Sequence, residues 1–195
     1  MKRILIAAVL LSAALPSAAQ RNTGYYEDYV QYLPLAMYVG LVLTDNDNPD
    51  RFTDLLISGS LSYVTEALAV NSLKLIVNEK RPNGTTNNSV PSGHTATAFT
   101  AAELVRLEKG WGWGAGAYAA ASLVAYARAA HQCHWWWDSA AGAAIGILSA
   151  NLGYRCTRPI KRAFGWELPR EALVSFHPDI NPYTRTACAS ISLVF

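Results

Sequence analysis

The sequence has little net charge and few cysteines. Its 195 residues include 16 basic and 14 acidic side chains, a near balance that excludes binding of nucleic acids through a strongly basic surface. Cysteine occurs only at Cys133, Cys156 and Cys188. Three cysteines allow one disulfide if the chain is exported, and we favour Cys156 with Cys188, which leaves Cys133 as a buried free thiol.

Long, strongly apolar runs are also scarce after the N-terminal residues. The uncharged stretches at residues 110–127 and 139–154 are rich in alanine and glycine, whereas a helix needs about 20 strongly apolar residues to cross a bilayer. The mean hydropathy of the whole chain is only +0.11. We therefore expect a protein that is soluble or bound at a membrane surface, with an integral membrane protein as the less favoured alternative.

The N-terminus has the composition of a secretory signal. Two basic residues follow Met1, an apolar run covers residues 4–15, and small residues come next. We predict cleavage after Ala19, so that residues 1–19 form a signal peptide and the protein is exported to the periplasm or cell envelope. An uncleaved N-terminal anchor is the alternative, although the run is short for a membrane span.

The rest of the chain predicts an all-α protein, a helical bundle with a short C-terminal β-hairpin. We expect the helical domain over residues 20–165 and a tail over residues 166–195. Turn signals separate the expected helices, which cover residues 30–44, 51–80, 92–107 and 134–152. A further helix is expected between the glycines at 110–114 and residue 130. Apolar and polar residues alternate over residues 187–195, and turn signals at residues 177–182 would join this strand to a partner.

Two separated stretches concentrate groups that suit a phosphate. Lys74 and Arg81 are seven residues apart, so on one helix they would point to the same side. Pro-Ser-Gly-His follows at residues 91–94, at an expected helix start. Unpaired backbone N–H groups, the Ser92 hydroxyl as helix cap, and close approach at Gly93 would favour an anion there. Each pattern alone is also typical of an ordinary helix surface.

A third stretch adds a histidine with a carboxylate. His134 and Asp138 are four residues apart and would be neighbours on a helix, where the carboxylate can orient the imidazole ring and leave its other nitrogen free to attack. Arg128 lies six residues before His134, at the expected end of the preceding helix, and offers a planar fork for two phosphate oxygens.

The surroundings of His134 permit two further interpretations. His131, Cys133 and His134 are metal-ligand types, but one lone cysteine with this spacing makes an incomplete zinc site, so no metal is expected. Three consecutive tryptophans occupy residues 135–137, and we expect them to line the pocket and the core.

In their order and spacing, the three stretches resemble the signature of the type 2 phosphatidic acid phosphatase and vanadium haloperoxidase superfamily. That signature is Lys, six residues, Arg-Pro; then Pro-Ser-Gly-His; then Ser-Arg, five residues, His, three residues, Asp. The chain departs from it at Ala127, where the family usually has Ser before the Arg. The resemblance implies a helical bundle of this family's type, and Ala127 removes one hydrogen bond near the pocket.

The resemblance also implies a role for each residue. His134 would be the nucleophile that forms a phosphohistidine, Asp138 would orient it, and His94 would protonate the leaving oxygen and later activate water. The groups that would hold the phosphate oxygens are Lys74, Arg81, Ser92, Gly93 and Arg128. No metal or other cofactor is implied for this reaction.

We therefore expect a metal-independent phosphatase that acts on phosphate monoesters or lipid phosphates. One alternative is a vanadium-dependent haloperoxidase, for which vanadate would be a cofactor instead of an inhibitor, and another is a non-catalytic anion-binding protein of the envelope. The expected partners are a phosphorylated small molecule or lipid headgroup and a membrane surface, without nucleic acid. Basic residues gather over residues 155–170, where they suit anionic headgroups or simply a solvated surface.

Overall fold

The structure is a computed structural model of the chain, and it describes residues 27–44, 49–164, 175–181 and 186–192. Side chains are described over residues 28–44 and 51–164. The predicted signal peptide at residues 1–19 lies outside these ranges. The chain divides into one unit that ends at Ile160 and a second that begins at Lys161.

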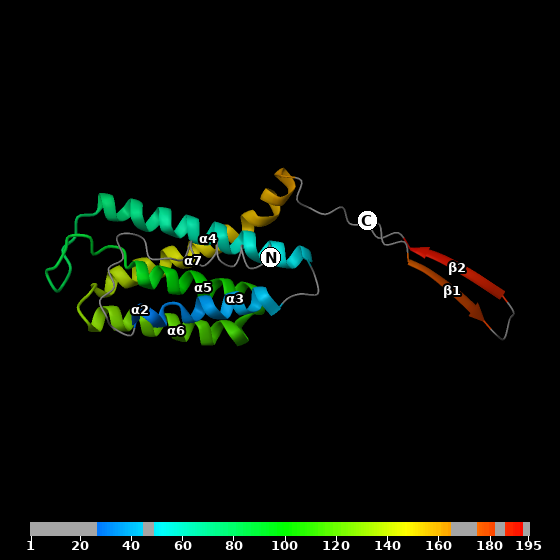
Figure 1. The fold of residues 1–195 in the computed structure, drawn as a ribbon, viewed down its shortest axis with the longest axis horizontal. Helices are drawn as coiled ribbons and strands as arrows, with labels where there is room; N and C mark the ends of the chain where they lie inside the picture. The colour runs from blue at the N-terminus through cyan, green and yellow to red at the C-terminus, as the bar shows by residue number, and fades with distance from the viewer. Residues whose placement is uncertain (1–26, 45–48, 165–174, 182–185, 193–195) are drawn as a thin grey trace. The chain divides into compact units, whose positions relative to one another are not determined.

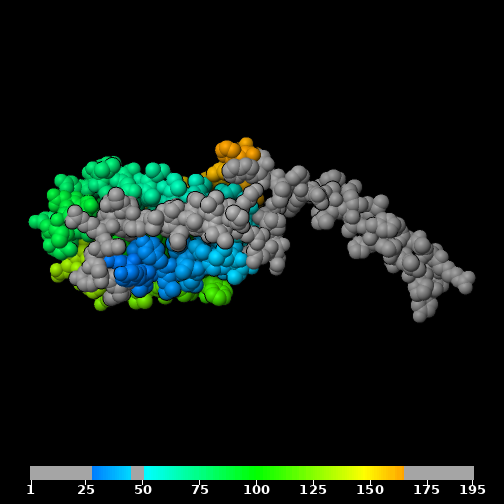
Figure 2. Space-filling view, in the orientation of Figure 1, coloured from blue at the N-terminus to red at the C-terminus, as the bar shows by residue number. Residues whose placement is uncertain are grey.

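The elements of the described residues are mainly helices (Figure 1). In chain order they are α2 (Glu27–Val30), α3 (Leu33–Thr44), α4 (Pro49–Ile76), α5 (Gly93–Lys109), α6 (Trp111–Ala130), α7 (Trp136–Ala163), β1 (Ser175–Asn181) and β2 (Thr186–Ser192). The all-α bundle predicted from the hydrophobic spacing is confirmed. On the face seen in Figure 2, α4 and the pair α2 and α3 form much of the coloured surface, and parts of later segments are visible around them.

Helix α5 lies at the centre of the bundle, in contact with α3, α4 and α6. Most of its first thirteen residues are buried, and these are largely alanine and threonine. Such small side chains let neighbouring helices approach from every side. The core around α5 combines buried apolar residues of four helices: Leu35 and Tyr38 of α3, Leu55 and Tyr63 of α4, Leu104 and Val105 of α5, and Val124 of α6.

Three glycines of α7 allow this helix to lie directly on its neighbours. A Cβ atom at Gly142 would lie 2.5 Å from the carbonyl oxygen of Ser92, and one at Gly146 would lie 2.5 Å from that of Ala96. At Gly153 it would lie 2.7 Å from the backbone nitrogen of Ser62 in α4. Because real Cβ atoms do not approach backbone so closely, the α7 contacts with α5 and α4 require glycine.

A buried carboxylate links α5, α6 and α7 near the C-terminal end of α5. Glu103 is 1% exposed and accepts hydrogen bonds from Arg106 at 2.5 and 2.6 Å, from the Tyr118 hydroxyl at 2.6 Å and from the Asn151 amide at 2.6 Å. Burial alone would raise the pKa of Glu103, but these hydrogen bonds hold it below its ordinary value. The charge is therefore satisfied by groups from three helices.

Several predicted helix boundaries are wrong. Helix α4 ends at Ile76, not near residue 80, because the chain then turns into a loop in which Glu79 forms a β-bridge to Asn88. Gly110 alone separates α5 from α6, with a φ of 74° that favours glycine, and the glycines at 112 and 114 belong to α6. Helix α7 begins at Trp136, after His134, and continues well beyond residue 152.

In the second unit, β1 and β2 pair antiparallel, from Ser175 with Ser192 to Asn181 with Thr186. This is the C-terminal hairpin expected from the alternating pattern. The turn was expected at residues 177–182, but residues 177–181 belong to β1, so the connection comes later than predicted. None of the helices that the structure describes is both long enough and apolar enough to span a membrane.

Candidate active site

The three sequence stretches meet at the N-terminal ends of α5 and α7. The Ser92 N–H, just before α5, donates to the carbonyl oxygen of Asp138 in α7 at 3.0 Å. The loop over residues 77–92 is joined to the turn after α6, because the Asn83 N–H donates to the carbonyl oxygen of Gln132 at 3.2 Å. The first turns of two central helices and two connecting segments thus surround one place in the bundle.

A tight turn between α6 and α7 brings Arg128 and His134 together. The carbonyl oxygen of Arg128 accepts from the N–H groups of both Cys133 and His134 at 3.1 Å. Gln132, at the tip, has a φ of 54°, in the left-handed region that lets the chain reverse. His134 therefore lies in this turn and not on a helix as predicted, while Arg128 occupies the last turn of α6 as expected.

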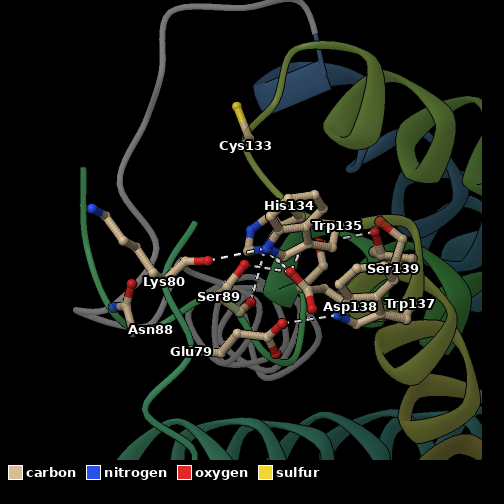
Figure 3. A network of polar contacts seen from close by, with 12 residues as sticks. Glu79, Lys80, Asn88, Ser89, Cys133, His134, Trp135, Trp137, Asp138 and Ser139 are labelled. Carbon is tan, nitrogen blue, oxygen red and sulfur yellow. Dashed lines mark hydrogen bonds and ion pairs between the residues drawn. The ribbon is translucent and has the colours of Figure 1, made fainter. Parts of the chain in front are cut away.

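The ring of His134 is held in one tautomer by the backbone. Its Nδ1 atom is 2.8 Å from the carbonyl oxygen of Ser89 and 3.5 Å from Oδ2 of Asp138 (Figure 3). A carbonyl oxygen can only accept, so Nδ1 carries the hydrogen and donates it. The other nitrogen, Nε2, then has a lone pair that is available to a ligand.

His134 is buried among positive charges. Burial lowers the pKa of its ring to about 4, and Arg81, Arg128 and Lys74 add to this effect, while the hydrogen bond with Asp138 opposes it. At neutral pH the imidazole is therefore uncharged and able to act as a nucleophile.

Asp138 is fully buried in the first turn of α7. Its Oδ2 atom accepts a hydrogen bond from the Ser89 hydroxyl and one of 2.9 Å from the Trp135 N–H (Figure 3). The second bond returns from the third helical residue to the residue before the helix, as in a capping box. Burial would raise the pKa of Asp138, but hydrogen bonds from His134, Ser89 and Trp135 lower it below the ordinary value. The carboxylate therefore remains charged.

Ser89 is a site residue that the sequence did not reveal. Its carbonyl oxygen contacts His134 and its hydroxyl contacts Asp138 (Figure 3). It lies in a polar stretch that looks like an ordinary linker. A backbone acceptor has no residue-type signal, so only the spatial neighbour could identify it.

The N-terminus of α5 is arranged for an anion. Ser92 occupies the N-cap position, as predicted, but its side chain makes no capping hydrogen bond and instead accepts from the Thr95 hydroxyl at 3.0 Å. The N–H groups of the first turn, beginning at Gly93, therefore have no side-chain cap, and they carry the positive end of the helix dipole. His94, the second residue of α5, is buried beside them.

The prediction that Lys74 and Arg81 share a helix is wrong, because Arg81 lies in the loop beyond the end of α4. Both cations nevertheless act on the same place, since each lowers the pKa of His94 and of His134. Burial lowers the pKa of Lys74 itself to about 8, helped by the charges of Arg81 and Arg128. Three cations from three segments thus converge around two histidines.

An acidic residue outside the three stretches also reaches the site. In α2, Oδ1 of Asp28 is 2.8 Å from Nε2 of His94 and 3.3 Å from Nη1 of Arg128. All three side chains are almost fully buried. Asp28 lies 46 positions before Lys74 in a segment without a motif, so no sequence pattern indicated this contact.

The tryptophans at residues 135–137 were expected to line the pocket and the core. They are not in the core, and Trp136 is 70% exposed. Trp135 and Trp137 stack with ring centroids 5.0 Å apart, and their Nε1 atoms donate to the Lys80 carbonyl oxygen and the Glu79 carboxylate (Figure 3). They hold the loop over residues 77–92 against the start of α7.

Cys133 is buried and forms no disulfide, as expected, and its thiol donates to the carbonyl oxygen of His131 at 3.6 Å and points away from the ring of His134 in Figure 3. Cys156 is also a free thiol, in contrast to the predicted disulfide. The side chain of Cys188, its predicted partner, lies outside the described residues. Over residues 28–44 and 51–164, no group of three or more His, Cys, Asp or Glu side chains is arranged to hold a metal ion.

Comparison with known proteins assigns the family. Residues 55–162, more than half of the chain, match the PAP2 superfamily, and the chain therefore belongs to it. Over 104 residues the chain is 41% identical to the lipid A 1-phosphatase of Porphyromonas gingivalis, a match that covers 51% of this chain and 23% of that protein. The chain thus spans about a quarter of the length of this relative.

A solved structure has a similar fold. The crystal structure of LpxE from Aquifex aeolicus superposes with a TM-score of 0.54 and 22% sequence identity. The alignment covers 78% of this chain and 93% of that chain. This likeness supports the helical fold described above.

Proposed function

We propose that the chain is a metal-independent phosphatase that removes phosphate from lipid phosphate monoesters through a phosphohistidine at His134. The observation that carries the proposal is the hydrogen bond from Nδ1 of His134 to the Ser89 carbonyl oxygen, which leaves Nε2 as a neutral, oriented nucleophile among cations. The name of the relative from P. gingivalis supports a lipid phosphate as substrate. Lipid phosphates are membrane components, so the enzyme would act at the cell envelope.

In the first step, the lone pair on Nε2 of His134 attacks phosphorus, and the bond from phosphorus to the ester oxygen breaks. His94, protonated in the complex, gives its proton to that oxygen, so the alcohol leaves neutral. The dianionic substrate supplies the charge that this protonation needs, because burial and the nearby cations hold the pKa of His94 far below its ordinary value without it.

Charge on the transferring phosphoryl group would be stabilised by fixed positive groups. Lys74, Arg81 and Arg128 act electrostatically on both histidines, and the N–H groups of the first turn of α5, with the Ser92 hydroxyl, would donate to the phosphate oxygens. In the second step, His94 takes a proton from water, the water oxygen attacks phosphorus, and the nitrogen–phosphorus bond breaks. Phosphate leaves, and both histidines return to their starting states.

The test combines a substrate panel with trapping of the intermediate. The purified protein is assayed on p-nitrophenyl phosphate and on a long-chain lipid phosphate in mixed micelles, with and without EDTA and vanadate. We expect hydrolysis of both, preference for the lipid, no loss with EDTA, and inhibition by vanadate, which imitates the pentacoordinate state. Loss of activity in EDTA that zinc or magnesium restores would contradict the metal-independent mechanism.

For the intermediate, ³²P-labelled substrate is quenched in alkali, where phosphohistidine survives, and the labelled peptide is identified. We expect the label on the peptide that contains His134, and its absence in His134→Ala. The matched control is His131→Asn, three residues earlier and outside the proposed machinery, which should trap label as the wild type does. Label that persists in His134→Ala rules out His134 as the nucleophile.

A further inference from the structure

The contact of Asp28 with His94 resembles the contact of Asp138 with His134. In each pair a buried carboxylate lies beside one nitrogen of a buried histidine. At His134 the occupied nitrogen is Nδ1, and at His94 it is Nε2. Each ring therefore has a buried carboxylate beside one of its two nitrogens.

The side of His94 that faces Asp28 is closed. Its Nε2 atom is buried, and Oδ1 of Asp28 lies 2.8 Å away but off the axis of a hydrogen bond. An ester oxygen could reach Nε2 only by displacing the carboxylate. The other nitrogen, Nδ1, is consequently the one from which a proton can pass to a leaving group.

The charges that face His94 come from every neighbouring segment. Positive charge comes from Arg128 of α6, Lys74 of α4 and Arg81 of the loop after α4, and His134 adds a titratable ring. Against them, Asp28 of α2 brings negative charge into direct contact. Its Oδ1 atom also contacts Arg128, so the same carboxylate restrains the guanidinium that would hold the phosphate.

We propose that Asp28 is a positioning residue for phosphoryl transfer, which holds His94 through Nε2 with Nδ1 directed at the leaving oxygen and stabilises the protonated ring. The inference rests on the proposed function. Asp28 neither donates nor accepts the transferred proton: the proton moves from Nδ1 of His94 to the ester oxygen as that oxygen leaves phosphorus. The role of Asp28 is to offset the positive charge that the ring carries while it is protonated.

The test is Asp28→Asn, which keeps the shape of the side chain and removes its charge. We expect kcat/KM on an alkyl phosphate, which reports the first step, to fall about 10- to 100-fold, the range of a lost acid–base contribution, with less than about fivefold loss on p-nitrophenyl phosphate. A nitrophenolate leaves without a proton, so the first step on this substrate does not need a proton from His94. In a His94→Asn background, Asp28→Asn should not change the ratio of the two activities further. The control is Glu108→Gln, an acid at the far end of α5, which should leave the ratio unchanged.

A second readout does not depend on turnover. The ring nitrogens of His94, assigned with His94→Asn, are followed by NMR across a pH series with saturating inorganic phosphate. We expect Asp28→Asn to lower the pKa of His94 in this complex by about one unit or more, the usual effect of a lost neighbouring charge. Thermal unfolding of both proteins establishes that the variant is folded.

Two results would overturn the proposal. Higher activity or a lower KM on both substrates in Asp28→Asn would mean that the carboxylate competes with phosphate for the site. Equal losses on both substrates, with an unchanged His94 titration, would mean that it only supports the fold. If the wild type hydrolyses no phosphate ester, the proposed function fails, and the phosphate-bound titration still decides whether Asp28 controls His94.

Discussion

The two ends of helix α5 both bury charge, but they do so differently. At the C-terminal end, Glu103 is surrounded by donors from Arg106, Tyr118 and Asn151, and the hydrogen bonds hold it ionised. At the N-terminal end, positive charge predominates, and both His94 and His134 have a lowered pKa. The charge at the C-terminal end is therefore balanced by groups of the protein, whereas the N-terminal end has an excess of positive charge.

This difference separates a structural cluster from a binding site. A buried charge that the protein neutralises connects helices and needs nothing from solution. A cluster in which burial and positive charge together lower the pKa of its histidines is stabilised when an anion arrives. The end of α5 that contains His94 is therefore expected to control activity, and the end that contains Glu103 is expected to control stability.

The largest effect is expected from His134→Ala. Removing the proposed nucleophile should lower kcat at least about 1,000-fold, which corresponds to about 4 kcal/mol of activation free energy. The fold should remain, as measured by circular dichroism and by a melting temperature close to that of the wild type. Activity within about tenfold of the wild type would mean that this end of α5 does not work through His134.

Glu103→Gln should give the opposite result. The substitution replaces a carboxylate that accepts hydrogen bonds from three side chains by a neutral amide. The free energy of unfolding should therefore fall by about 2–3 kcal/mol in urea titrations. Activity per folded molecule should stay within about twofold. Glu108→Gln is the matched control: its partner Arg51 is 3.6 Å away and 43% exposed, so the loss should be below about 1 kcal/mol. Equal losses of stability in the two variants would mean that the hydrogen bonds of Glu103 contribute no more to stability than a partly exposed ion pair.

Arg81→Gln should move the acid limb of the kcat/KM profile. In the proposed mechanism His134 attacks as the neutral ring, so activity should fall when the pH drops through its pKa. Burial lowers this pKa to about 4, and the positive charge of Arg81 contributes to the shift. Without the charge of Arg81 this pKa rises, and the acid limb should shift upward by roughly one pH unit. The ionisation of the substrate is the same for both enzymes and cancels in the comparison. An unmoved limb would show that Arg81 does not act on His134.

The smallest effect is expected from Ser89→Ala. The variant loses the hydroxyl that binds Asp138 but keeps the carbonyl oxygen that accepts from His134. We expect kcat to fall by about 3- to 10-fold with little change in KM, as for loss of one supporting hydrogen bond. A loss as large as that of His134→Ala would mean that the ring is oriented chiefly through Asp138.

Much of the architecture could be predicted because it depends on local patterns. Hydrophobic spacing indicated the bundle, and the strand alternation indicated the hairpin. The three motifs indicated which residues come together, and Arg128 does lie at the end of α6. The family match covers residues 55–162, which include all three motifs.

The errors arose where tertiary contacts decide the structure. The end of α4 depends on pairing between Glu79 and Asn88 within the following loop, which hydrophobic spacing does not encode. The partner of His134 is a backbone carbonyl oxygen at Ser89, for which no side-chain pattern exists. Asp28 reaches the site from a helix far from every motif, so only the packed structure reveals it.

The close contacts at Gly142 and Gly146 mean that the backbones of α7 and α5 set the distance between His94 and the segment of His134 and Asp138. Gly142 lies one helical turn after Asp138, and its contact is with the residue that precedes α5. Apolar substitutions elsewhere in the core are therefore expected to change the spacing of His94 and His134 less than a methyl group at Gly142 does. If the proposed function holds, Gly142→Ala should lower activity on every phosphate ester alike, whatever group the ester carries.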